Sequence, residues 1–165
     1  MADEPAKHDT TARAAPAGGA ARDDVPTLNE LILVAREGAE FYLGAAAKVQ
    51  STRLRDLFHE MAAARARLVD DLRLHVAAAG AQPPDPTSFG LNLRKLYVDL
   101  LARTADDTDR SYVAQLEEIE DGLLQAFEDA VAEARAPEIR KVLEHHLPRV
   151  RAGHDRVRAM KQALH

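Results

Sequence analysis

Residues 53–79 read RLRDLFHEMAAARARLVDDLRLHVAAA, and the fold prediction starts from this stretch. Its apolar side chains recur at alternating steps of four and three residues, which is the spacing of one buried helical face. That face comprises Leu54, Phe58, Met61, Arg65, Leu68, Leu72, His75 and Ala79. Ser51 and Thr52 precede it and are residue types that cap helix N-termini. We therefore predict a long helix over 53–79 that packs in a bundle.

A second amphipathic helix is predicted upstream, over residues 28–49. Thr27 at the N-cap and Glu30 three residues later form a capping box, in which each side chain accepts a free backbone amide. The short connection to the next helix implies an antiparallel hairpin. Residues 1–25 contain almost no large apolar side chain and are predicted to be a disordered tail, which leaves 26–165 for the bundle.

Three more helices are predicted downstream. A run rich in Gly and Pro (GAQPPDP) ends the helix over 53–79, and a short helix is expected over 89–103. Long helices follow over 107–134 and 137–164, and Pro148 should kink the last of them. The predicted fold class is all-α: a four-helix bundle of two helical hairpins, joined by a long crossover that carries a short extra helix.

Composition excludes several classes of function. The 165 residues include no Cys, so disulfide scaffolds, thiolate zinc sites and Cys nucleophiles are excluded. The net charge is −5, and residues 1–24 are themselves acidic, so we expect no nucleic-acid binding. No stretch resembles a signal peptide or a membrane span, and we expect a cytoplasmic protein that does not bind membranes.

The two hairpins are related by an internal repeat. A shift of 85 residues places Tyr42 on Phe127 and Phe58 on Leu143, with a shared apolar pattern. Two such hairpins and a crossover resemble the ferritin-like, rubrerythrin-like bundle. The segments LNELI (28–32), GAEFY (38–42), Glu117-x-x-Glu120-Asp121 and HDRVR (154–158) are similar to a bacterial ferritin-like family described mainly as a domain of unknown function. The resemblance covers about residues 27–163.

This resemblance implies where a dinuclear metal site would lie. Relatives that bind metal carry a Glu on two helices and a Glu-x-x-His pair on the other two. The implied positions in this chain are Ala35, Arg65, Leu68, Glu120, Val150 and Gly153. Glu120 is the one carboxylate among them, so we do not expect the standard di-iron centre, nor any other cofactor.

Arg65 lies on an apolar face, where a metal-binding relative would have Glu. A buried guanidinium without a partner would cost on the order of 3–5 kcal/mol. We therefore predict that Arg65 and Glu120 form an ion pair in the core. The alternative is that Arg65 extends to the edge of the bundle and Glu120 faces water.

Other polar residues have two interpretations each. Glu117, Glu120 and His154 are candidate ligands of a non-standard iron or manganese site, but such residues are common on helix surfaces. Asp71 and His75, one turn apart, could chelate a metal at the surface. Glu37 is assigned to the helix surface or to the rim of the buried face. The run Arg149, Arg151, Arg156 and Arg158 is assigned to a solvated face.

His154 and Asp155 could form a His oriented by a carboxylate, as in acid–base catalysis. Adjacent residues of a helix do not normally face one another, and no nucleophile accompanies them, so we expect no catalysis there. Leu91, Leu96 and Tyr97 of the crossover could form an apolar docking stripe, or cover the bundle end.

The sequence leaves more than one function open. The first is a non-catalytic ferritin-like bundle that acts through a protein partner or as a homodimer, in bacterial stress physiology. The alternative is a metal-binding oxidoreductase or iron-handling protein that uses iron or manganese at Glu117, Glu120 and His154. A third is an adaptor that binds partners through the crossover.

Overall fold

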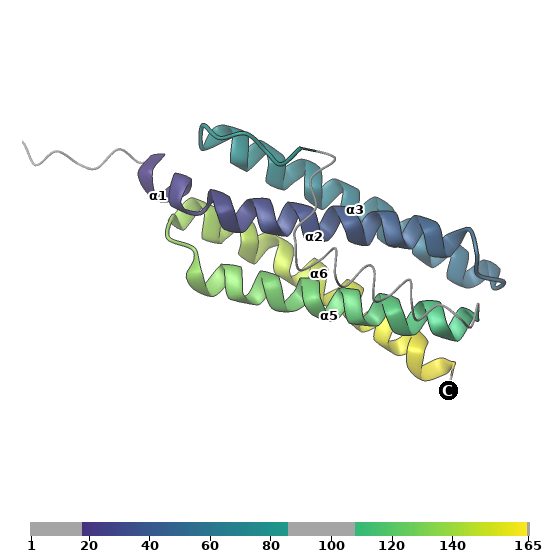
Figure 1. Ribbon diagram of the computed structural model, residues 1–165. Coiled ribbons are helices and arrows are strands. Elements are labelled where there is room, and N and C mark those ends of the chain that lie inside the picture. The colour runs from purple at the N-terminus through teal and green to yellow at the C-terminus, as the bar shows by residue number, and fades with distance from the viewer. Residues whose placement is uncertain (1–17, 86–107, 165) are drawn as a thin grey trace, which may run out of the picture.

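The computed structural model describes residues 18–85 and 108–164, and in these residues every regular element is a helix. Four long helices lie side by side, and a short helix precedes them (Figure 1). The elements are α1 (Gly18–Asp23), α2 (Val25–Ala46), α3 (Thr52–Ala78), α5 (Asp109–Glu133) and α6 (Pro137–Ala163). The predicted all-α four-helix bundle is therefore confirmed.

The four long helices form two antiparallel hairpins, α2 with α3 and α5 with α6. Arg22 Nε donates to the carbonyl of Ala79 at 3.3 Å, so α3 ends beside α1. The Asp109 carboxylate accepts from the backbone amides of Gln50 and Ser51 at 2.7 and 2.9 Å, so α5 begins beside the end of α2. The chain thus leaves the first hairpin at one end of the bundle and enters the second at the other end. This is the predicted arrangement of two hairpins and a crossover.

The ends of α3 follow the sequence signals. Ser51 is its N-cap, and the Ser51 hydroxyl accepts from the Leu54 amide at 3.3 Å. Gly80 follows the helix with φ +78°, a left-handed conformation that Gly adopts without the cost imposed by a Cβ atom. The predicted range of 53–79 differs from the observed helix by one residue at each end.

The predicted capping box at Thr27 is wrong. Helix α2 begins at Val25, so Thr27 lies inside its first turn, and the N-cap is Asp24. Pro26 suits the first turn because its missing amide has no partner there in any helix. The Asp24 carboxylate does not cap its own helix. Instead it accepts from the backbone amides of Arg135 and Ala136, at 2.8 to 3.1 Å, and joins α2 to the turn between α5 and α6.

The predicted disordered tail over 1–25 does not extend to its end, because residues 18–23 form α1 and Val25 is already in α2. Ala21 is 8% exposed and belongs to the core, so its small side chain is enough to pack α1 against the bundle. Three parts of the prediction lie outside the described residues. They are residues 1–17, the helix over 89–103, and the stripe of Leu91, Leu96 and Tyr97. None of the described helices is long and apolar enough to span a membrane.

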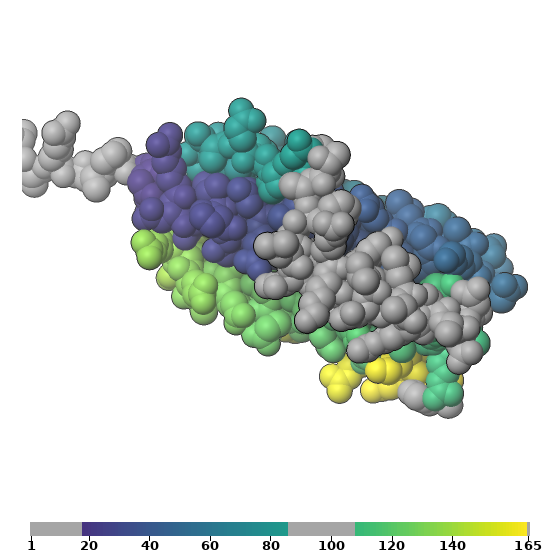
Figure 2. All heavy atoms as spheres, in the orientation of Figure 1, coloured from purple at the N-terminus to yellow at the C-terminus, as the bar shows by residue number. Residues whose placement is uncertain are grey.

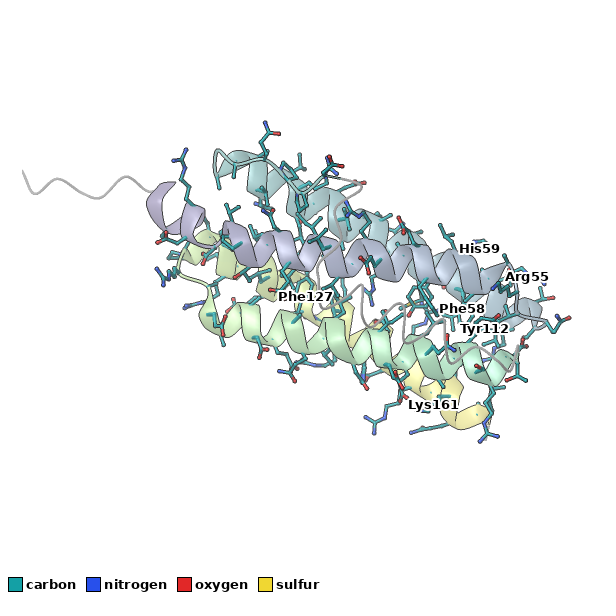
Figure 3. All side chains as sticks on the ribbon, in the orientation of Figure 1. Arg55, Phe58, His59, Tyr112, Phe127 and Lys161 are labelled. Atoms are coloured by element: carbon teal, nitrogen blue, oxygen red, sulfur yellow. The ribbon has the colours of Figure 1, made fainter. Side chains whose placement is uncertain are left out.

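Helix α6 continues through Pro148, and the predicted kink there stays a prediction. Apolar side chains fill the bundle in two clusters along its length. Figure 3 labels Phe127 of the first cluster and, well separated from it toward the other end of the bundle, Phe58 and Tyr112 of the second. Space-filling atoms show α2 and α5 packed together on one face (Figure 2).

Candidate functional site

A buried polar layer separates the two apolar clusters. Along each long helix, one or two buried polar residues or glycines separate the residues of one apolar cluster from those of the other. Glu120 is 0% exposed and Arg65 is 3% exposed, although charged side chains are almost never fully buried unless paired. The residues of this layer are Glu37 on α2, Arg65 on α3, Glu120 on α5, and Gly153 and His154 on α6. The layer is the candidate functional site.

Arg65 and Glu120 form a two-pronged ion pair at the centre. Arg65 Nε donates to Glu120 Oε1 at 3.2 Å, and Arg65 Nη2 contacts Glu120 Oε2. The structure thus brings together the two residues that the sequence places in the core, rather than sending them to the surface. Such paired, charge-assisted bonds are stronger than neutral ones and fix the relative position of the two side chains. Here they fix α3 against α5.

Tyr42 of α2 completes the hydrogen bonds of Glu120. Its hydroxyl donates to Glu120 Oε1 at 2.9 Å, and Tyr42 itself is 0% exposed. Burial, together with the charge of Glu120, raises the pKa of Tyr42 well above its ordinary value. The phenol therefore stays protonated and remains a donor. Each oxygen of Glu120 has at least one donor, so the buried charge is compensated.

Gly153 of α6 provides the space for the Arg65 guanidinium. A Cβ atom added at Gly153 would lie 2.8 Å from Arg65 Nη2 and 2.9 Å from Met61 Cε. It would also lie 3.5 Å from Glu120 Oε2. These two shorter distances are below any real Cβ contact, so the ion pair is packed directly against the backbone of α6. All four long helices meet at this point.

Glu37 belongs to the same layer, but no hydrogen bond among the described residues compensates for the burial of its carboxylate. It is 7% exposed, and neither carboxylate oxygen has a hydrogen-bond partner within the described part of the chain. Burial, reinforced by the charge of Glu40 and opposed by Arg36, raises the pKa of Glu37 to about 7. Of its two interpretations, the helix surface or the rim of the buried face, the first is therefore wrong, and Glu37 lies within the buried layer.

The three candidate metal ligands do not converge. Glu120 is bound to Arg65 and Tyr42, whereas Glu117 contacts the ammonium of Lys161. His154 lies between two other carboxylates: its Nε2 is 2.6 Å from Asp121, and its Nδ1 is 3.0 Å from Asp155. Among the described residues, no group of three or more His, Asp or Glu side chains is arranged to hold a metal ion.

The contact between His154 and Asp155 corrects an expectation. Adjacent residues of a helix normally point apart, but the His154 ring contacts both Asp155 and Asp121 of α5. Burial disfavours the charged ring, but the hydrogen bonds of Asp155 and Asp121 and their charges outweigh burial and raise the pKa of His154. The arrangement joins α6 to α5.

Asp71 and His75 do lie close together, with 3.8 Å between Asp71 Oδ2 and His75 Nε2. The same Asp71 oxygen is also in contact with His146 Nε2 of α6. Asp71 therefore links α3 to α6, a role that the one-turn spacing within α3 could not reveal.

The residues at the centre do not fit a dinuclear metal site. Ala35, Leu68 and Val150 are buried apolar side chains, and Gly153 has none. The remaining carboxylate, Glu120, already holds a guanidinium, whose positive charge would repel a cation at the same place. A hard cation needs several deprotonated oxygen or nitrogen ligands, whereas this centre offers one carboxylate that is already paired with a positive charge.

The sequence places Gly153 at the centre, among the implied ligand positions, but does not predict that it makes room for Arg65, nor that Tyr42 donates to Glu120. The repeat carried a signal for Tyr42, because it aligns with Phe127 and so places a hydroxyl where the other half has an apolar ring. For Gly153, the signal was a Gly inside a long helix, where it costs about 1 kcal/mol relative to Ala and often marks close packing.

The family described as a domain of unknown function (DUF2383) matches residues 23–133. No curated protein matches the chain. Among solved structures, a mutant of Dps1 from Mycobacterium smegmatis is similar, with a TM-score of 0.68 and 14% sequence identity. The similarity covers 86% of this chain and 97% of that one. It shows the fold alone, which is that of a ferritin-like helical bundle.

Proposed function

Since this chain belongs to the family described as a domain of unknown function (DUF2383), we propose its function from the chemistry of its own core. The protein is a ferritin-like bundle that is non-catalytic, carries no resident metal or other cofactor, and acts through self-association or a protein partner. A cytoplasmic location and a part in bacterial stress physiology belong to the same proposal, and the family resemblance supports the part in stress physiology alone.

The observation that carries the proposal is the pairing of Glu120. A buried carboxylate could serve as a ligand, an acid or a base only if one of its oxygens were open to a substrate or an ion. Both oxygens of Glu120 instead accept from Arg65 or Tyr42, and Gly153 leaves room for little more than the guanidinium. The centre is therefore suited to holding the four helices in register, and function falls to the surface.

Exposed leucines support an interaction role. Leu43 of α2 is 50% exposed and Leu74 of α3 is 68% exposed, and both are large apolar side chains. We expect a homodimer in sedimentation velocity across a wide range of protein concentration. A monomer at every concentration would contradict the self-association form of the proposal.

Metal analysis tests the central part of the proposal. The full chain is expressed in medium supplemented with iron and manganese, purified without chelators, and measured by elemental analysis. We expect far less than one ion per chain. A stoichiometric metal would instead support the alternative, an iron-handling or oxidoreductase protein.

A double-mutant cycle tests whether Arg65 and Glu120 act as one unit. We expect Arg65→Met and Glu120→Leu each to lower the free energy of unfolding by about 3–5 kcal/mol, because each leaves an unpaired buried charge. The double variant should recover much of that loss, since no charge then remains buried. Urea unfolding followed by circular dichroism provides the measurement.

The matched control is the exposed pair of Arg156 and Glu60, with 2.8 Å between Nη2 and Oε2. Removal of either partner there should change stability by less than about 1 kcal/mol. If the core double variant lost the sum of the two single losses, Arg65 and Glu120 would not act as a pair.

A further inference from the structure

A groove of about 480 Å³ lies between α3 and α6. These two helices approach each other less closely than the two helices of either hairpin do. Polar side chains from both helices line the groove: Arg65, Arg67 and Asp71 from α3, and His145, His146 and Arg149 from α6. Its volume is within the range of sites that bind small molecules.

The charges in the groove do not balance. Arg65 is neutralised by Glu120, and Asp71 is the one carboxylate among the described residues that line the groove. Asp71 Oδ2 is already in contact with His146, and His75 Nε2 lies 3.8 Å from the same oxygen. The remaining cations, Arg67 and Arg149, therefore give the groove a local excess of positive charge.

Unlike Arg151 and Arg156 of α6, Arg67 of α3 and Arg149 of α6 have no partner among the described residues that would compete with a ligand. Arg151 donates to Glu128 at 3.1 Å, and Arg156 donates to Glu60 at 2.8 Å. Neither Arg67 nor Arg149 has a hydrogen bond or an ion pair within residues 18–85 and 108–164. One of them comes from each wall of the groove, so a ligand that bridges α3 and α6 would lie between them. The described surface of this acidic chain offers many carboxylates, and within it these two arginines pair with none of them.

We propose that this groove binds a small phosphate-bearing anion through Arg67 and Arg149. The planar guanidinium matches the spacing of two phosphate oxygens and binds them in a bidentate manner. The exposed ring of His145 adds a further donor at the rim of the groove. A net charge of −5 over the whole chain disfavours long polyanions, so the ligand is a small molecule rather than a nucleic acid. No catalysis is required of the site, and it lies outside the buried polar layer apart from Arg65.

Calorimetric titration at constant ionic strength tests the proposal with three probes: inorganic phosphate, pyrophosphate and ADP. We expect at least one probe to bind the wild-type chain at one site. The variant Arg67→Gln/Arg149→Gln should weaken that binding by about tenfold or more, since it removes two charge-assisted contacts. Comparison of the probes shows whether an isolated phosphate, a diphosphate or an attached nucleoside is preferred.

The matched control is Arg73→Gln/Arg158→Gln. It removes the same charge from the same two helices, at arginines that also lack partners among the described residues but do not line the groove. We expect it to change the affinity by less than about twofold, and thermal unfolding should show both variants folded. The proposal is overturned if no probe binds, or if both variants weaken binding equally, because diffuse surface charge would then account for it.

Discussion

Gly153 shows how much of the centre depends on a single residue. In most helix interiors, Gly→Ala stabilises the protein, since Ala has a helix propensity better by about 1 kcal/mol. At Gly153 the added methyl group would collide with the Arg65 guanidinium, which cannot move away without breaking its bonds to Glu120.

We therefore expect Gly153→Ala to lower the free energy of unfolding by about 1–3 kcal/mol, in line with other overpacked cores. Urea unfolding measures the change. Gly122→Ala in α5 is the matched control, because nothing lies within 4 Å of a Cβ at that position. That variant should be as stable as wild type or more stable. Equal stabilisation by both substitutions would show that Arg65 is not held in place.

The sequence predicted some residues of the buried layer and missed others. Arg65 was visible because it interrupts an apolar face, and the repeat pointed to Glu120. Glu37 was not visible, because its place along α2 is equally compatible with the rim of the bundle. Only the packing of the other elements against α2 removes water from its carboxylate.

At the scale of the helices, Asp24 connects elements that are distant in sequence. Its carboxylate is 5% exposed and accepts the backbone amides of Arg135 and Ala136, which lie between α5 and α6. Ala136 is the N-cap of α6 and offers no side-chain cap of its own. The start of α2 thus satisfies amides that precede α6.

We expect Asp24→Ala to cost about 2–4 kcal/mol, because it leaves two amides without their charged acceptor. Amide hydrogen exchange should then accelerate at Arg135 and Ala136. Asp23→Ala is the control: Asp23 is exposed and makes only a surface ion pair with Arg135 at 3.4 Å, so its loss should cost less than about 1 kcal/mol. Similar effects of the two substitutions would contradict the role assigned to Asp24.

Helix boundaries illustrate why local signals are sometimes misleading. The cap at Ser51 was predicted correctly, since its hydroxyl bonds to an amide three residues away. The cap at Thr27 was predicted wrongly, although the capping-box pattern was present. There the preceding residues contact the end of α3, where Arg22 Nε donates to Ala79, and helical structure begins upstream of the local start signal.

For the molecule as a whole, two buried groups make stability depend on pH in the same direction. Burial raises the pKa of Glu37 from 4.5 to about 7, so the folded state holds a proton that the unfolded chain releases at lower pH. Although burial opposes it, the pKa of His154 is also raised, by Asp155 and Asp121. The folded state therefore binds more protons than the unfolded state, and the free energy of unfolding should fall as the pH rises from about 5 to 8.

The variant Glu37→Gln isolates one of these groups. It should be more stable than wild type by about 1–3 kcal/mol at pH 8, and the difference should shrink toward pH 5, where Glu37 is protonated in the folded state. Urea unfolding at several pH values gives the curves. Glu30→Gln, an exposed position on the same helix, should leave them unchanged. A wild-type protein that gains stability between pH 6 and pH 8 would contradict this explanation.

The four long helices, their pairing into hairpins and the ferritin-like arrangement could all be read from the chain, because apolar spacing and caps such as Ser51 act over a few residues and survive without tertiary context. The lack of the usual metal ligands could also be predicted from the sequence, since the side chains of Ala35 and Gly153 have no atom that could bind a metal, wherever they lie. The sequence could not predict the distances between side chains on different helices. Helix rotation and separation decide the contact of His154 with Asp121 and the hydrogen bond of Tyr42 to Glu120. They also decide that Arg67 and Arg149, along the α3–α6 groove, find no partner within the described parts of the chain. Small shifts in helix rotation or separation change every contact between helices, while the sequence pattern stays the same.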